Sequence, residues 1–498
     1  MRKKQRVSKN YQENVACLNR ELGVPDSFDV VFREMLIGGK KVAIYSINGM
    51  IDEQATGYVL QALVSLEQDE LTVNTLEKLV RGRIASLQVS EAESLDQVFY
   101  SLLSGPIAIL VEGQEKAILV DLRSYPGRTP EEPDTERVTR GSRDGFTETL
   151  AMNTALIRRR LRDPKLRMKL VQVGSRSKTD VCIAYIENIT NLGLVREIQE
   201  DIQKINIDGI PMAEKSVEEF ILGSKVWNPY PRVRYTERPD VAAIHLLEGH
   251  VVIMVDTSPS VMIAPATFWH HTQHAEEYRQ EPVVGAFLRL VRFVGIVISL
   301  FLTPLWLGAV LNPQEIPAWL QFVIVQQPGK ISLFWQTLIA DLGVDMVRMA
   351  AIHTPSPLAT ALGLIAAFMM GEVAIEVGLF APEVIMVTAF AAVGTFATPS
   401  YEFSLANKLV RLLLIVLTGL FNFTGFFGGA LVVFIILLRT KSFGVPYLWP
   451  LIPLDIRALA MIIFRSPVPV KNRRPSILKP QDITRQPEGR KEKKERTK

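Results

Sequence analysis

The chain has 498 residues, of which 48% are hydrophobic and 22% charged, and its formal net charge is only +4. This small excess gives no electrostatic reason to expect a nucleic acid as a partner. Two cysteines, Cys17 and Cys182, are too few for a secreted disulfide framework and fit a reducing compartment. The length suffices for two or three domains. Residues 1–288 have the composition of a soluble protein, whereas residues 289–464 are mostly apolar.

Residues 1–26 begin with the basic run MRKKQRVSK but lead into no apolar segment of the kind found in a cleavable signal peptide. We therefore expect an N-terminal tail, followed by a domain that stays in the cytosol.

The soluble part contains an internal repeat. KVAIYSINGMID (41–52) resembles DVCIAYIENITN (180–191), and each is a short β-rich run that ends in a turn. Helical patterns such as VEEFIL lie between the β-rich runs. The repeat predicts two related α/β subdomains, over residues 27–127 and 170–265.

A second pair of runs follows at corresponding places in the two copies. PIAILVEGQEKAILVDLRSYPG (106–127) and VAAIHLLEGHVVIMVDTSPSV (241–261) are each predicted to form two strands joined by a turn. The turn contains Gly113 in the first copy and Gly249 in the second.

Residues 128–169 bridge the subdomains and include a predicted helix that begins near Asp144 and ends by Pro164. Seven lysines and arginines fall between Arg158 and Lys169. The candidates for a subunit or lipid interface are Arg158, Arg159, Arg160, Arg162, Lys165 and Arg167. A solvated helix held by salt bridges is the alternative interpretation.

Residues 266–288 are predicted to be a juxtamembrane linker. It includes FWHHTQHAEEYRQ (268–280), in which His270 and His274 would share one helix face, as metal ligands can. No further ligands are obvious elsewhere in the sequence, so a polar linker helix without a metal is favoured.

Residues 289–464 predict a helical membrane domain with about four spans. The candidate spans are 293–311, 357–371, 384–400 and 412–438. The last has 27 uncharged residues, more than a bilayer core requires, which predicts a tilt, a kink near Gly425 or two half-helices. Between the first two spans, residues 316–353 predict amphipathic or re-entrant helices.

Residues 465–498 form a basic tail with twelve Lys/Arg against four Asp/Glu. A basic block beside a span marks the cytosolic side of the membrane. Four crossings then place both the N-terminal domain and the tail in the cytosol. A solvated tail is favoured, and contact with anionic lipid is the alternative.

Glu372 and Glu376 interrupt an otherwise uncharged region, four residues apart on one helix face. Acids within a membrane domain usually face a bundle interior or water, and in an oligomer they would form rings of the kind that line cation pores. We therefore expect them to line an ion path, with Asp341 and Asp345 at its mouth. The alternatives are a position at the membrane interface or pairing with Arg348 or Lys408.

The sequence offers no catalytic constellation. It contains no Gly-x-Ser-x-Gly elbow, paired CxxC or kinase motif, and VGSRSKTD (173–180) lacks the spacing of a phosphate loop. We expect no enzyme activity and no cofactor.

Four stretches resemble the GerA family of bacterial spore germination proteins, and specifically its A-type subunits. They are ERVTRGSRDGFTETLAMNTALIRRRLRDPKL (136–166), VGSRSKTDVCIAYIENI (173–189), GEVAIEVGLFAPEVI (371–385) and SFGVPYLWPLIP (442–453). The resemblance implies a multi-pass protein of the spore inner membrane. It also implies a homo-oligomer that conducts ions, and other germination membrane proteins as partners: a transporter-like B-type subunit, a lipoprotein C-type subunit or a small membrane protein.

One stretch departs from the pattern of the nutrient receptors. Receptor A subunits of the family carry a Pro-Glu-Asp-Tyr-like stretch before the first span, where this chain has FWHHTQHAEEYRQEP (268–282). The departure favours an auxiliary channel that triggers or amplifies germination through release of monovalent cations and dipicolinate. The alternatives are a nutrient receptor A subunit, a non-conducting membrane scaffold and, with little support from only four spans, a secondary transporter.

Overall fold

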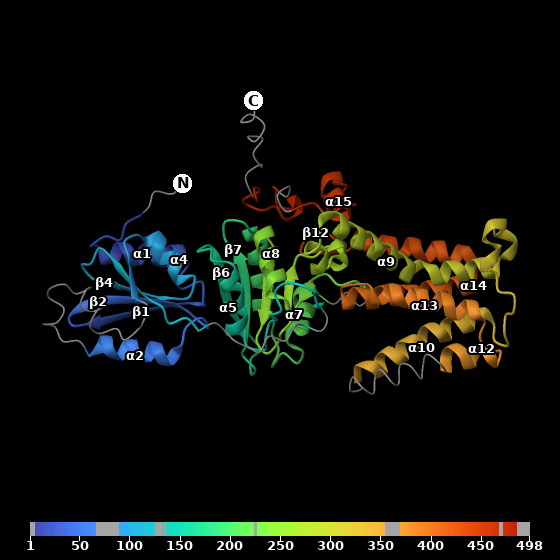
Figure 1. Ribbon diagram of the computed structural model, residues 1–498, viewed down its shortest axis with the longest axis horizontal. Helices are drawn as coiled ribbons and strands as arrows, with labels where there is room; N and C mark the ends of the chain where they lie inside the picture. Colours follow the sequence, from blue (N-terminus) through green and yellow to red (C-terminus); the bar gives the residue numbers. More distant parts are fainter. Residues whose placement is uncertain are drawn as a thin grey trace, which may run out of the picture. The chain divides into compact units, whose positions relative to one another are not determined.

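The structure is a computed structural model of the chain. It describes residues 5–65, 89–124, 133, 136–223, 227–353, 369–467 and 472–485. The chain forms two compact units (Figure 1). Unit 1 comprises Met1–Ser224, Tyr235–Pro265 and Val468–Lys498, and unit 2 comprises Lys225–Arg234 and Ala266–Pro467.

Unit 1 contains two five-stranded sheets with the same strand order. The first sheet has the order β1-β2-β4-β5-β3 and the second β6-β7-β9-β10-β8, so each strand has a counterpart in the other sheet. The strands of the first sheet are β1 (Val30–Ile37), β2 (Lys40–Ile47), β3 (Val89–Ala92), β4 (Ile107–Val111) and β5 (Ala117–Val120). Those of the second are β6 (Leu166–Val173), β7 (Thr179–Ile186), β8 (Arg234–Thr236), β9 (Val251–Val255) and β10 (Val261–Ala264). The shared topology confirms the predicted repeat of two α/β subdomains.

Helices cover both faces of the first sheet. In Figure 1, α1 and α4 lie over one face and α2 over the other. The central strand β2 alternates between the two cores, since Tyr45 packs with Leu18 of α1 while Ile44 packs with Leu63 of α2. The helices of unit 1 are α1 (Tyr11–Leu22), α2 (Glu53–Val64), α4 (Leu95–Leu102), α5 (Leu150–Arg160), α6 (Leu192–Gln203), α7 (Ala213–Leu222) and α8 (Pro239–Glu248).

Two predictions for unit 1 were wrong. Residues 1–26 are not merely a tail, because α1 buries Leu18 and Leu22 in the first core. The run 241–248 is not a strand, because it forms most of α8, which ends at Gly249 with φ +102°. Glycine is the residue that most readily adopts this conformation at a helix C-terminus, so Gly249 ends a helix, whereas Gly113 does lie in the turn between β4 and β5.

The C-terminal segment 472–485 belongs to unit 1 and is not a freely solvated tail. Arg474 Nε donates a hydrogen bond to the Leu247 carbonyl oxygen at 2.8 Å, and Gln481 Nε2 donates one to the Thr190 carbonyl oxygen at 2.8 Å. Leu478 is buried. The segment is therefore held against the second subdomain.

Unit 2 is helical. Its helices are α9 (Pro282–Leu311), α10 (Leu333–His353), α12 (Ala374–Glu376), α13 (Pro382–Phe396), α14 (Tyr401–Arg439) and α15 (Ile456–Ile463), with the π-helix η8 (Met369–Val373) and short 3-10 helices that include η4 (Phe268–Thr272), η5 (Ala275–Tyr278) and η7 (Ala318–Val323). A two-stranded ribbon, β11 (Lys441–Ser442) and β12 (Val445–Pro446), follows α14. By length and composition, α9 and α14 are candidates to cross a membrane, and α13 is apolar but shorter.

Helix α14 is two half-helices that reverse direction at Asn422, whose φ of 54° and ψ of −144° are not helical. A straight helix would separate residues 417 and 425 by about 12 Å, yet a Cβ on Gly425 would collide with the Leu417 carbonyl oxygen. Similarly, a Cβ on Gly429 would lie 2.9 Å from Leu414 Cδ2. The two halves therefore pack against each other as a hairpin, so of the three predicted alternatives the structure has two half-helices.

The hairpin defines two ends of the helical unit. At the proximal end, the start of α14 meets the chain that follows it, because Phe403 and Tyr447 belong to one buried cluster. At the distal end, the turn at Asn422 lies beside the end of α9, because Phe423 Cε1 would be 3.0 Å from a Cβ on Gly308. Helix α13 runs from the distal end to the proximal end, opposite to α9, and Figure 1 shows the two side by side.

The other predicted spans are partly described. The run 293–311 lies within α9, and the run 384–400 corresponds to α13 and the residues after it. The run 357–371 falls mostly outside the described residues. Residues 316–353 form the 3-10 helix η7 and the helix α10, neither of which meets the criteria for a span.

Candidate functional site in the helical unit

A buried ion pair joins α10 to α14. Arg411 Nη2 lies 2.7 Å from Asp341 Oδ1, and both side chains are 1% exposed. Arg411 Nη1 also donates to the Ser299 carbonyl oxygen at 2.8 Å and to Thr395 Oγ1 at 3.1 Å. One guanidinium thus joins α14 to α9, α10 and α13, and it satisfies the rule that a buried charge needs a partner.

A second ion pair lies one turn away on the same helices. Lys408 forms an ion pair with Asp345, and Lys408 Nζ also donates to the Asp341 carbonyl oxygen at 3.4 Å. Asp341 and Asp345 are four residues apart, and Lys408 and Arg411 are three apart, so each pair of like charges shares one helix face. The predicted acidic mouth is therefore neutralised by basic partners inside the same chain.

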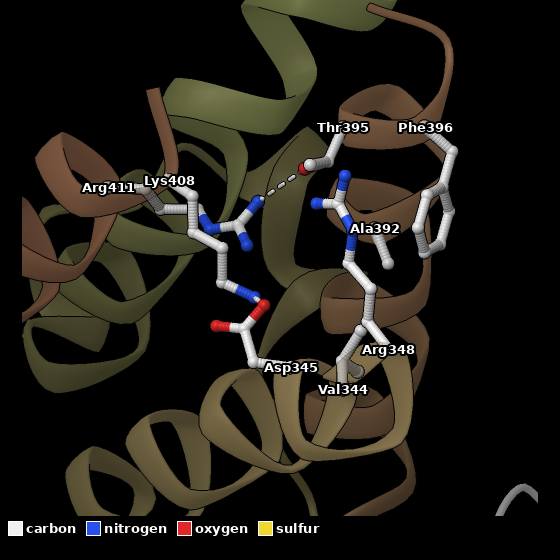
Figure 2. A pocket seen from close by; sticks show the side chains of 8 residues that line it. All are labelled: Val344, Asp345, Arg348, Ala392, Thr395, Phe396, Lys408 and Arg411. Carbon is white, nitrogen blue, oxygen red and sulfur yellow. Dashed lines mark hydrogen bonds and ion pairs between the residues drawn. The ribbon is translucent and has the colours of Figure 1, made fainter. Parts of the chain in front are cut away.

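Arg348 completes this group of charges from the next turn of α10. Its guanidinium lies over the ring of Tyr401, 4.9 Å from the centroid, and 5.5 Å from the centroid of Phe396. Such cation–π contacts suit a partly desolvated arginine. Figure 2 shows the guanidinium groups of Arg348 and Arg411 on either side of Thr395.

Glu372 and Glu376 lie elsewhere in unit 2. Glu372 is in the π-helix η8 and Glu376 ends α12, and both side chains are exposed in the single chain. They lie towards the distal end, because Ala381, five residues after Glu376, packs in one buried cluster with Leu307 and Val310 at the end of α9. Neither has an ion pair with another residue that the structure describes, so the predicted pairing with Arg348 or Lys408 does not occur there.

The histidine-rich stretch is not one polar helix, because it forms the two short 3-10 helices η4 and η5. His271 is buried, and its ring stacks on Phe403 with centroids 5.8 Å apart. Burial, together with the charge of Arg234, lowers the pKa of His271 to about 3. His271 is therefore a neutral core residue at physiological pH.

Glu277 of η5 is also buried, where it pairs with Arg292 and with Arg289, whose Nε lies 2.6 Å from Glu277 Oε2. These two arginines belong to the first turns of α9. Arg289 also donates to the carbonyl oxygens of Met461 and Ile462 at the end of α15. The linker is thus part of the helical unit and is fixed at its proximal end.

The basic residues of the bridge are mostly bound within unit 1. Arg158 is 1% exposed and its Nη2 lies 2.7 Å from Asp29 Oδ2, which joins α5 to the start of the first subdomain. Arg167 is 4% exposed and pairs with Glu187 at 2.7 Å. The predicted interface role is therefore wrong for these two side chains, which are not accessible to a lipid or another subunit.

Two further bridge residues, Arg160 and Lys165, have acidic partners in the same unit, Asp144 and Glu21. Arg159 and Arg162 have exposed side chains. The alternative of a helix held by salt bridges accounts for most of this cluster.

Comparison with known proteins identifies the family. The sequence profile of the Bacillus/Clostridium GerA spore germination proteins matches residues 16–477. The chain belongs to the GerA family. It is 48% identical to stage V sporulation protein AF of Bacillus subtilis (strain 168), over 97% of this chain and 98% of that protein. It is 30% identical to spore germination protein KA of the same organism, over 96% of this chain and 89% of that protein.

A solved structure is also similar to this GerA-family chain. The N-terminal domain of the A subunit of the Bacillus megaterium spore germinant receptor GerK3 is 31% identical, with a TM-score of 0.43, and covers 54% of this chain and 99% of that one. The resemblance to GerA proteins drawn from four sequence stretches is confirmed.

Sequence analysis missed the role of Arg411 and gave Lys408 the wrong partner. A usable signal was present in LANKLVRLLL (405–414), where two basic residues share a helix face at the start of a long apolar run. Buried basic residues require acidic partners, and the pair Asp341 and Asp345 has the matching spacing. The sequence does not show which helices become neighbours.

Proposed function

We propose that this GerA-family protein is a multi-pass subunit of the spore inner membrane that oligomerises and conducts monovalent cations during germination. In this proposal, unit 1 and the C-terminal segment lie in the cytosol, and four helical segments cross the membrane: α9, α13 and the two halves of α14. Cation movement triggers or amplifies germination, and dipicolinate release follows. The partners are other germination membrane proteins: a transporter-like B-type subunit, a lipoprotein C-type subunit or a small membrane protein.

Membrane insertion is supported by the surfaces of α9 and α14. Large apolar side chains point outward along both helices, for example Val297 at 55% and Leu420 at 64% exposure. Polar and charged groups such as Asp341 and Arg411 are buried among the helices. This inside-out distribution is the one expected of a helical bundle in lipid.

Conduction rests on a single observation: Glu372 and Glu376 are exposed carboxylates in an apolar unit, with no basic partner in the described part of the chain. An uncompensated carboxylate needs water around it. In an oligomer each position becomes a ring of negative charge, which attracts cations. Asp341 and Asp345 hold the helices together in this proposal and do not bind the permeant ion.

The test is single-channel recording in planar bilayers, with the purified protein alone and with its candidate small membrane partner. We expect cation-selective openings, and a lower cation-to-anion permeability ratio in the double variant Glu372→Gln, Glu376→Gln. Glu402→Gln, a neutralisation at the proximal end, is the matched control and should keep the wild-type ratio. Openings that the double variant leaves unchanged would remove both glutamates from the path.

The neutralised pairs of Asp341 and Asp345 favour a second candidate, a non-conducting scaffold that docks other germination proteins. Its membrane charges would serve only to hold the helices together. Folded protein that gives no openings with any partner, and that tolerates both glutamine substitutions, would support the scaffold.

A further inference from the structure

The segment 451–464, which follows the ribbon after α14 and includes α15, carries a group of large apolar side chains on its surface. These exposed side chains are Leu451, Ile452, Leu454, Ile456 and Phe464, and Ile456 is 73% exposed. Single exposed apolar residues are common on proteins, whereas a contiguous group marks a surface that contacts a protein or a membrane.

Helix α15 orients part of this group. Its N-cap Asp455 accepts a hydrogen bond from the backbone N–H of Ala458 at 3.0 Å, and Ala458 is buried. Ile456, Ala460 and Phe464 follow one another at a spacing of four residues, so they share one helix face, and all three are exposed. A helix of eight residues is about 12 Å long, too short to cross a bilayer. The helix therefore presents an apolar face without being able to span.

The place of α15 beside α9 fixes its depth relative to a bilayer. Figure 1 shows α15 beside the start of α9, where Arg289 donates to the carbonyl oxygens of Met461 and Ile462. Arg289 stands four residues before the uncharged run 293–311, which is about 6 Å along the helix. The headgroup region on each side of the hydrocarbon core is about 5–8 Å thick. If the run 293–311 spans the core, α15 lies at the level of the headgroups.

Charge and chain order favour lipid as the occupant of this apolar face. Arg457 is exposed next to Ile456, and Arg439 and Lys441 are exposed at the end of α14. The second half of α14 returns the chain to the proximal end, and residues 468–498 belong to unit 1, so the segment stays on the cytosolic side in the proposed topology. Basic side chains beside an apolar face are typical of helices that lie on an anionic membrane surface.

We propose that residues 451–464 are a membrane-surface anchor, whose apolar side chains enter the boundary between headgroups and acyl chains in the cytosolic leaflet. Because Arg289 joins α15 to the first turns of α9, the anchor holds the start of α9 at a fixed depth. This inference rests on the membrane insertion stated in the proposed function and not on ion conduction.

The experiment measures the environment of a spin label attached to a single cysteine, in full-length protein reconstituted into liposomes of phosphatidylethanolamine and phosphatidylglycerol. Cys17 and Cys182 are replaced by alanine, and the label is placed at Ile456 or at Phe464. Collisions with oxygen, which concentrates in lipid, are compared with collisions with a nickel chelate, which stays in water. We expect an oxygen-to-nickel ratio several-fold higher at both positions than at Leu36, a matched control that is also 73% exposed but lies in unit 1.

A label at Val297 in the middle of α9 separates this inference from the proposed membrane insertion. A high ratio at Val297 with ratios at Ile456 and Phe464 equal to that at Leu36 would overturn the anchor and leave insertion standing. Labels at Ile456 and Phe464 that neither reagent reaches would also overturn it, because a protein surface would then cover the segment. A low ratio at Val297 in folded protein would refute insertion itself, and the anchor with it. All of these substitutions replace exposed side chains, so the melting temperature should stay at the wild-type value.

Discussion

The reversal of α14 at Asn422 can be tested by joining its two halves. Gly425 lies against Leu417 and Gly429 against Leu414, and this register continues to Val410 and Val433, which are buried in the same cluster. In a straight helix these two valines would be about 34 Å apart. A disulfide requires Cα atoms within about 7 Å, so the two arrangements differ by far more than any helix bend can supply.

We therefore predict that Val410→Cys, Val433→Cys forms a disulfide within one chain upon mild oxidation, in a background where Cys17 and Cys182 are replaced by alanine. Mass spectrometry of the linked peptides identifies the bond. A mixture of isotopically heavy and light protein separates links within a chain from links between chains.

The matched control moves each cysteine by one residue, to Leu409 and Val432, whose side chains are 59% and 54% exposed and point away from the partner half. This pair should not form a link within the chain. If folded protein gave no internal link for the valine pair, or equal linking for both pairs, the hairpin would be refuted.

Three further predictions concern stability. Asp29→Ala leaves Arg158 buried without its carboxylate and should lower the free energy of unfolding by about 3–5 kcal/mol, as measured by urea denaturation. An equal loss of stability when an exposed aspartate is replaced by alanine would contradict the argument. The pKa of His271 is about 3 in the folded chain against 6.5 for the free side chain. The neutral ring therefore contributes fully to the free energy of unfolding above pH 6.5, and this contribution falls by about 1.4 kcal/mol for each pH unit between pH 6.5 and pH 3. His271→Phe should flatten this part of the profile of melting temperature against pH. Gly394→Val would place a Cβ against a backbone carbonyl of α9 and should cost about 1–3 kcal/mol or more, while Gly428→Ala, which meets no atom within 4 Å, should cost little in the same thermal assay.

Local sequence patterns predicted β2, β7 and the β4–β5 hairpin because those strands are short, β-branched and bounded by turns, but they did not predict β1 and β6, which pair with β2 and β7. The strand β2 and the β4–β5 hairpin lie where the repeat placed them. The same pattern wrongly predicted a strand for the run VAAIHLLE (241–248), because a short apolar run fits a buried strand and a buried helix equally. What decides between them is Gly249, whose positive φ closes a helix, and a glycine in a sequence does not reveal whether it ends a helix or turns a hairpin.

The length of the uncharged run alone limited the shape of α14 to a few alternatives. A run of 27 uncharged residues is too long for one bilayer crossing, which allowed a tilt, a kink or two half-helices. Gly425 was the expected position, but the reversal occurs at Asn422. The glycines instead permit the two halves to approach, since Gly425 and Gly429 face Leu417 and Leu414, and close approach of helices is what small residues allow.

The charges of the helical unit were predicted least well, because a carboxylate's role depends on a partner that local sequence does not reveal. Asp341 and Asp345 were expected at the mouth of an ion path, yet Arg411 and Lys408 neutralise them from a helix that follows much later in the chain. Adding Arg348 makes the middle of the bundle positive, which repels cations. A cation path must therefore avoid this group, and the exposed glutamates towards the distal end, far along the helices from Arg348, are the carboxylates that could serve one.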